Sequence, residues 1–121
     1  RGIVRARVVG MMAMVLLIGA CAAPVAPQEW VGVSTDADGD HELTVLLNRA
    51  GARACGEYTV GVSTGAFEGT IEDGSVVALL TASHTCTYQF QGAITESALT
   101  GSYGPDDCQG GLAGTWTLSR P

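Results

Sequence analysis

The stretch FEGTIEDGSV, residues 67–76, reads as a strand, a tight turn and a second strand. Its Asp73-Gly74 pair is typical of a two-residue hairpin turn, because both central positions of that turn need a positive φ. The stretch has an echo 23 residues later in FQGAITESAL, residues 90–99. Two-strand units that follow one another in series predict an antiparallel meander.

The rest of the chain after residue 28 continues this pattern. Turn signals recur about every eight to twelve residues, and apolar and polar residues alternate between them, which is typical of a small sandwich or barrel. No segment beyond the first 28 residues shows helical spacing. We therefore predict an all-β domain with eight strands: Glu29–Ser34, His41–Asn48, Cys55–Val62, Ala66–Ile71, Ser75–Thr81, Thr85–Ile94, Ala98–Tyr103 and Leu112–Arg120.

Eight strands joined by short links favour closure into an up-and-down barrel, because closure removes the exposed strand edges. Arg120, at the end of the last strand, could stack on Trp30 and close the base of the barrel; the alternative is an ordinary surface arginine. An eight-stranded barrel is just wide enough to be filled by its own side chains. The residues expected inside are Val33, Leu43, Val45, Leu47, Phe67, Ile71, Val77, Leu79, Tyr88, Phe90, Leu99, Trp116 and Leu118.

Composition limits both the organisation and the partners. The 121 residues suffice for one domain, and an apolar content of 46% with 15% charged residues excludes a disordered chain. All six basic residues are arginines, and three of them lie within the first seven positions. Without residues 1–20, three arginines face twelve acids, a formal charge of −9 (3 minus 12). Such a surface repels phosphate backbones, so we expect no nucleic-acid partner.

Residues 1–20 have the three regions of an export signal. Arg1, Arg5 and Arg7 form a positive start, and the uncharged run VVGMMAMVLLI follows at residues 8–18. Two alternatives stay open: an ordinary signal peptide cleaved elsewhere, and an uncleaved membrane helix. The prolines at positions 24 and 27 argue against the second alternative, because they break a helix soon after it passes residue 20.

The tetrad Ile18-Gly19-Ala20-Cys21 resembles the lipobox of bacterial lipoproteins. The family prefers Leu and Ala or Ser where this chain has Ile18 and Gly19. The resemblance implies a signal peptide over 1–20, palmitate-type lipid on Cys21, a Pro/Ala tether completing 21–28, and a domain over 29–121. Lipid would anchor the chain to the cell envelope. Because Ala22 is not an Asp, the family convention implies the outer membrane of a two-membrane bacterium, and otherwise the outer face of the cell membrane.

The domain has a less specific resemblance. Its end, GTWTLSR at residues 114–120, is similar to the closing strand of small glycine-rich β domains of bacterial lipoproteins. It also resembles lipocalin and avidin barrels, although those open with Gly-x-Trp, whereas here Trp30-Val31-Gly32 runs the other way round. This resemblance implies a barrel fold and transfers no ligand site.

Three cysteines remain after Cys21, and an exported protein is expected to form one bridge and keep one leftover thiol. In an eight-stranded meander, Cys86 and Cys108 fall at the same end of the barrel and Cys55 at the opposite end. We therefore predict a Cys86–Cys108 disulfide, with Cys55–Cys108 as the alternative. A zinc site is not expected, because the sequence has no Cys-x-x-Cys.

The segment DADGD, residues 36–40, is the sharpest candidate for a ligand site. Oxygen ligands on Asp36, Asp38 and Asp40 resemble a calcium loop, but the glycine is at the fourth position instead of the sixth and no Glu closes the motif. The alternative is a solvated hairpin turn. Asp106 and Asp107 are expected at the same end of the barrel, so five carboxylates could gather there.

Residues 61–65, Gly-Val-Ser-Thr-Gly, match the letters of the Gly-x-Ser-x-Gly nucleophile elbow, but they fall between two predicted strands, whereas the elbow joins a strand to a helix. The sequence has only two histidines, His41 and His84. We expect neither an enzyme nor a cofactor. The sequence favours a non-enzymatic envelope lipoprotein, an interaction or structural module whose partners are the membrane and an envelope protein. The alternative is a lipocalin-like binder of a small apolar ligand inside the barrel.

Overall fold

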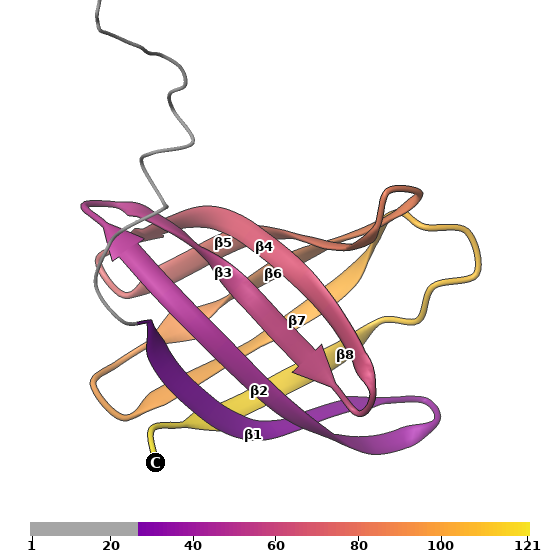
Figure 1. The fold of residues 1–121 in the computed structure, drawn as a ribbon, viewed down its shortest axis with the longest axis horizontal. Coiled ribbons are helices and arrows are strands. Elements are labelled where there is room, and N and C mark those ends of the chain that lie inside the picture. The colour runs from indigo at the N-terminus through magenta and orange to yellow at the C-terminus, as the bar shows by residue number, and fades with distance from the viewer. Residues whose placement is uncertain (1–26) are drawn as a thin grey trace, which may run out of the picture.

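The computed structural model describes residues 27–121, which fold into a closed barrel of eight antiparallel strands (Figure 1). Each strand pairs with the next along the chain, and the last strand pairs with the first. The strands are β1 (Gln28–Asp36), β2 (Gly39–Ala50), β3 (Arg53–Val60), β4 (Ser63–Glu72), β5 (Ser75–Ser83), β6 (Cys86–Ile94), β7 (Ala98–Asp107) and β8 (Gly114–Ser119).

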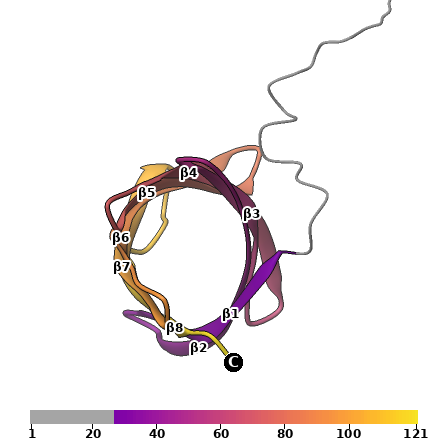
Figure 2. The same cartoon turned by 90° about the vertical axis from the view of Figure 1, so that its left-hand side faces the viewer.

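The predicted all-β, up-and-down barrel is thus confirmed, and residues 27–121 contain no helix. The predicted hairpin turn is also present: Asp73 and Gly74 both have positive φ, 52° and 81°, between β4 and β5. Figure 2 shows the eight strands as a ring. The ring closes where residues 31–36 of β1 pair with residues 114–119 of β8.

The barrel has two ends with different loops. We name the proximal end the one where β1 starts and β8 finishes; it carries the turns at residues 51–52, 73–74 and 95–97. We name the distal end the opposite one, which carries the turns at 37–38, 61–62 and 84–85 and the loop 108–113. Residues 1–26 precede β1 and lie outside the described part of the chain, so the predicted signal peptide and most of the tether lie there too.

The interior is filled by one apolar core contributed by all eight strands. An aromatic cluster lies at its centre: the Trp116 ring is 5.0 Å from Phe90, 5.4 Å from Tyr58 and 6.2 Å from Tyr103, measured between ring centroids. The buried apolar residues are Trp30, Leu43, Val45, Leu47, Ala54, Tyr58, Phe67, Ile71, Val76, Leu80, Phe90, Ile94, Leu99, Trp116 and Leu118.

The predicted orientation of β5 is wrong. Val77 and Leu79, expected inside, lie on the outer surface with 56% and 38% of their area exposed, whereas Val76 and Leu80 are buried. The sequence SVVALLT is apolar at both alternating sets of positions, so alternation alone could not choose between them. The two-residue turn decides the matter, because it pairs Ile71 with Val76 and residues paired across a hairpin share a face.

The orientation predicted for β1 is wrong for a related reason. Val33 lies outside with 37% of its area exposed, while Trp30 is 1% exposed and Ser34 is buried. The valines favoured one face, but the indole of Trp30 has far more apolar area to remove from water. Ser34 is accommodated inside because its hydroxyl hydrogen-bonds the Tyr103 hydroxyl at 3.2 Å. One large aromatic side chain therefore outweighs two valines in setting the register.

Candidate functional site

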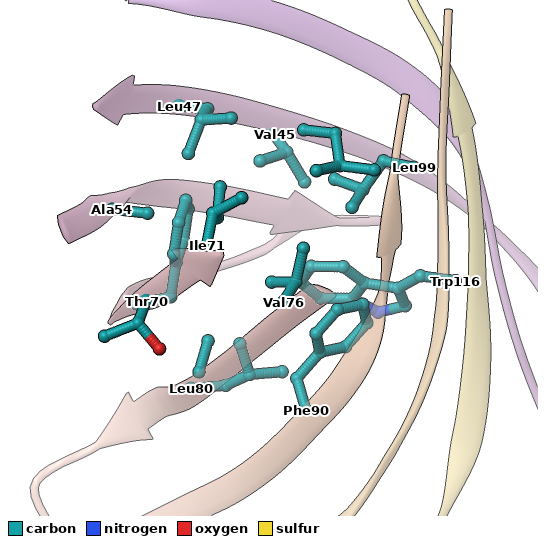
Figure 3. Close-up of a pocket in the computed structure, with 13 residues that line it drawn as sticks. Val45, Leu47, Ala54, Thr70, Ile71, Val76, Leu80, Phe90, Leu99 and Trp116 are labelled. Atoms are coloured by element: carbon teal, nitrogen blue, oxygen red, sulfur yellow. The ribbon is translucent and has the colours of Figure 1, made fainter. Parts of the chain in front are cut away.

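The barrel interior is the first place where a ligand could bind, and it is nearly full. The central cavity is about 30 Å³ and is lined by side chains such as Val45, Leu47, Ile71, Phe90 and Trp116 (Figure 3). Pockets for small molecules generally occupy about 300–1,000 Å³. The interior thus has room for roughly one water molecule and acts as a packed core.

The distal end is held by a disulfide between Cys86, the first residue of β6, and Cys108, the first residue after β7. The predicted pairing is therefore confirmed. Topology brings the two cysteines together, because β6 starts at the end where β7 finishes. The Tyr88 hydroxyl lies 3.6 Å from the Cys108 sulfur and packs beside this bridge.

Cys55 is on β3, where it pairs with Asn48 of β2 near the proximal end. It is disulfide-bonded, so the prediction of a leftover thiol is wrong. The two other cysteines among residues 27–121 are bonded to each other. Cys21, the predicted lipidation site, lies outside the described residues.

Two aspartates of the acidic segment at the β1–β2 turn make contacts within the hairpin. An Asp36 side-chain oxygen accepts a hydrogen bond from the Asp38 backbone N–H at 2.8 Å, and the same oxygen lies 3.4 Å from His41 Nε2. Asp40 accepts a hydrogen bond from the Thr35 hydroxyl at 2.8 Å. These contacts are those of a solvated hairpin turn, the alternative to the calcium loop.

Asp106 and Asp107 lie at the distal end, as the sequence analysis placed them. They do not complete a ligand set there. Asp106 instead accepts hydrogen bonds from Gln89 at 2.9 Å and Thr87 at 3.4 Å on the neighbouring strand β6. Within residues 27–121, no three His, Cys, Asp or Glu side chains are grouped so that they could hold a metal ion.

The two histidines and Glu68, which are side chains capable of acid–base chemistry, belong to separate segments of the barrel. His41 lies at the β1–β2 hairpin beside Asp36, and His84 is exposed in the turn between β5 and β6. Glu68 is on the outer face of β4, where it lies 3.7 Å from Arg53 of β3 in an exposed ion pair. The two histidines lie at different turns of the distal end, and Glu68 lies on the outer wall of the barrel.

The proximal end carries a groove that the sequence analysis did not identify. Its volume is about 290 Å³, and its lining includes Trp30, Arg49, Glu96 and Arg120. The Arg120 guanidinium carbon is 5.7 Å from the centre of the Trp30 ring, which confirms the predicted stacking at the barrel base. The other lining residues are Gln28, Ile71, Gly74, Ile94 and Thr95.

The arginines of the described domain gather at one end, whereas its acids lie at both. All three of its arginines lie at the proximal end: Arg49 near the end of β2, Arg53 at the start of β3 and Arg120 after β8. The distal end carries five aspartates, Asp36, Asp38, Asp40, Asp106 and Asp107, and the proximal end also carries the acids Glu29, Glu72, Asp73 and Glu96. The gathering of the arginines at one end follows from the direction of their strands.

Burial alters the acidity of two tyrosines, the buried Tyr58 and the partly buried Tyr103. Burial raises the pKa of Tyr58, and the nearby Tyr88 and Tyr103 add to the effect. Burial also raises the pKa of Tyr103, partly offset by its hydrogen bond with Ser34. Both hydroxyls therefore stay protonated in the folded protein at pH values where an exposed tyrosine would begin to ionise.

Residues 27–121 contain no helix that is long and apolar enough to span a membrane. No protein-family model, curated protein or solved structure significantly matches this chain.

Proposed function

We propose that this protein is an exported bacterial lipoprotein, anchored in the cell envelope by lipid on Cys21, whose barrel is a non-enzymatic interaction or structural module. The observation that carries the proposal is the leader sequence: three arginines, an uncharged apolar run and the tetrad IGAC at residues 18–21. Its expected location is the outer membrane of a two-membrane bacterium, or otherwise the outer face of the cell membrane.

The packed interior supports an interaction or structural module over a lipocalin-like protein that binds an apolar ligand inside the barrel. A lipocalin-like protein needs a cavity that encloses its ligand, whereas the space inside this barrel is about 30 Å³. Filling that space with side chains gives a small domain the core that it needs to fold. Binding of an envelope partner would therefore use the outer surface or the ends of the barrel.

The Cys86–Cys108 bridge supports export. Disulfides form and persist in oxidising compartments outside the cytoplasm, and small exported domains use them to supplement a limited core.

A lipid anchor would hold the barrel at the membrane durably. Each buried methylene of the lipid contributes about 0.8 kcal/mol to membrane binding, and a second chain makes release very slow.

Cys55 favours a second candidate, an exported domain without lipid. It is disulfide-bonded, and of the four cysteines of the chain only Cys21 is left besides Cys55 and the Cys86–Cys108 pair. A sulfur that carries lipid in a thioether cannot also form a disulfide. Lipid on Cys21 and a Cys21–Cys55 bridge therefore exclude each other, which gives a direct test.

The test is metabolic labelling with an alkyne fatty acid in a bacterial host, followed by mass spectrometry of the non-reduced protein. Lipidation predicts label on the wild type, loss of label in Cys21→Ser, and full label in the matched variant Cys55→Ser. An unlabelled wild-type protein that yields a Cys21–Cys55 cross-linked peptide would refute the anchor and establish the second candidate.

A further inference from the structure

The proximal groove combines two cationic side chains with one anionic side chain. Arg49 and Arg120 come from β2 and the chain end after β8, and Glu96 comes from the β6–β7 turn, so three separate segments converge on one space of about 290 Å³. That volume is close to the lower limit of small-molecule pockets, about 300 Å³. The charges at its wall sum to +1 within a domain that is acidic as a whole.

The two arginines are available to a ligand. Among the described residues, neither Arg49 nor Arg120 forms an ion pair; Arg53, the third arginine, is the one paired with Glu68. The Arg120 guanidinium carbon lies 5.7 Å from the centre of the Trp30 ring, which places its cationic group over the indole at the groove wall. A guanidinium group presents several N–H donors that match the geometry of a phosphate.

Trp30 contributes a further feature. Its indole N–H is buried and has no hydrogen-bond partner among the described residues. A buried donor without a partner costs free energy, so a residue of this kind is unusual unless something else satisfies it. Trp30 also lines the groove, so its indole reports on whatever binds there.

We propose that the proximal groove binds the phosphoethanolamine headgroup of a membrane lipid, with Arg49 and Arg120 on the phosphate and Glu96 on the ammonium group. The choice of a lipid source rests on the proposed function, because an anchor on Cys21 leaves only residues 22–27 between the membrane and β1. Six extended residues reach about 20 Å at most, so the proximal end would face the headgroups.

The chemistry distinguishes this ligand from related ones. An ammonium group donates hydrogen bonds to a carboxylate, whereas the trimethylammonium of choline has no N–H to donate. A phosphate without an amine leaves Glu96 as a nearby like charge. We therefore expect glycerophosphoethanolamine to bind more tightly than glycerophosphocholine or inorganic phosphate, and glycerol not to bind.

The experiment is a titration of the ¹⁵N-labelled full-length exported protein, in a non-ionic detergent, with these four compounds. The two tryptophans give two indole N–H signals in an NMR spectrum, and Trp116 in the core serves as an internal control for Trp30. The proposal predicts a saturable shift of the Trp30 signal alone. It also predicts that added salt weakens binding, because the groove is open to solvent.

Substitutions test which side chains contact the ligand. Arg49→Gln and Arg120→Gln should each weaken binding of glycerophosphoethanolamine about three- to fivefold, as expected for partly exposed charge contacts. Arg53→Gln is the matched control, since Arg53 is at the same end but does not line the groove. Glu96→Gln should abolish the preference for glycerophosphoethanolamine over inorganic phosphate.

Several outcomes would overturn the proposal. No shift of the Trp30 signal with any phosphate compound refutes the site, and equal weakening by Arg53→Gln reduces it to a general charge effect. Equal binding of inorganic phosphate and glycerophosphoethanolamine refutes the headgroup. The titration does not depend on lipid at Cys21, so its failure leaves the labelling result unaffected, and failed labelling leaves the titration interpretable.

Discussion

Gly32 lies where the barrel closes, and its substitution by alanine tests whether the β1–β8 seam depends on close approach of two backbones. Gly32 pairs with Leu118 in the six-residue register between these strands. A Cβ added at Gly32 would lie 1.9 Å from the Thr117 carbonyl oxygen and 2.8 Å from the Leu118 Cα. Both contacts are with backbone, which cannot rotate away as a side chain can.

The cost follows from the shortfall in distance. Ordinary contact begins at about 3.4 Å, so the two strands must separate locally by about 1.5 Å (3.4 minus 1.9). A separation of that size breaks two or three ladder hydrogen bonds, each contributing about 0.5–1.5 kcal/mol net. We expect Gly32→Ala to reduce the free energy of unfolding by about 3 kcal/mol, within the range known for overpacking.

The assay is thermal and urea unfolding followed by circular dichroism and tryptophan fluorescence. A loss of about 3 kcal/mol should lower the Tm by roughly 10–20 °C in a domain of this size. Gly104→Ala is the matched control, because a Cβ at this β7 position meets nothing within 4 Å. It should be neutral or slightly stabilising. Equal Tm values for the two variants would refute the reasoning about the seam.

Three further predictions concern the disulfide, the corrected register and pH. Replacing both Cys86 and Cys108 by alanine should reduce the free energy of unfolding by about 3 kcal/mol, since their bond closes a loop of 22 residues; urea unfolding measures this, and an unchanged midpoint contradicts it. Leu80→Ala should cost about 2–5 kcal/mol and Leu79→Ala less than about 1 kcal/mol, because Leu80 is 3% exposed and Leu79 is 38% exposed. The opposite order in thermal melts would restore the orientation favoured by the sequence. Burial raises the pKa of Tyr58 above its ordinary value of 10.0. The contribution of neutral Tyr58 to the free energy of unfolding should therefore be fully present below pH 10 and decline as the pH rises beyond it. Tyr58→Phe should make that decline shallower in urea unfolding between pH 8 and pH 12, and an unchanged slope would show that ionisation of Tyr58 does not contribute.

The site was less predictable than the fold. Alternation and turn spacing were sufficient to predict the eight strands. The up-and-down direction of those strands then placed Cys86 and Cys108 at one end of the barrel. The groove beside Trp30 combines residues from the ends of strands that are distant in sequence, and no motif marks such a combination. Strand direction could have indicated part of it, however. In an up-and-down barrel the end of β2, the start of β3 and the end of β8 lie together, so Arg49, Arg53 and Arg120 fall at one end.

The amino-acid sequence by itself determined the strand count and the meander order, and it favoured the Cys86–Cys108 disulfide over Cys55–Cys108. The strand count and order follow from local spacing, because turn residues end strands and alternation carries each strand across the barrel. It also contains the leader on which the proposed anchor depends. The buried face of β5 also follows from a local feature, because the Asp73-Gly74 turn pairs Ile71 with Val76. Only the tertiary structure decided which face of β1 is buried and how full the interior is. Those outcomes depend on how side chains from all eight strands pack into one small volume, and the sequence of a single strand does not specify that packing.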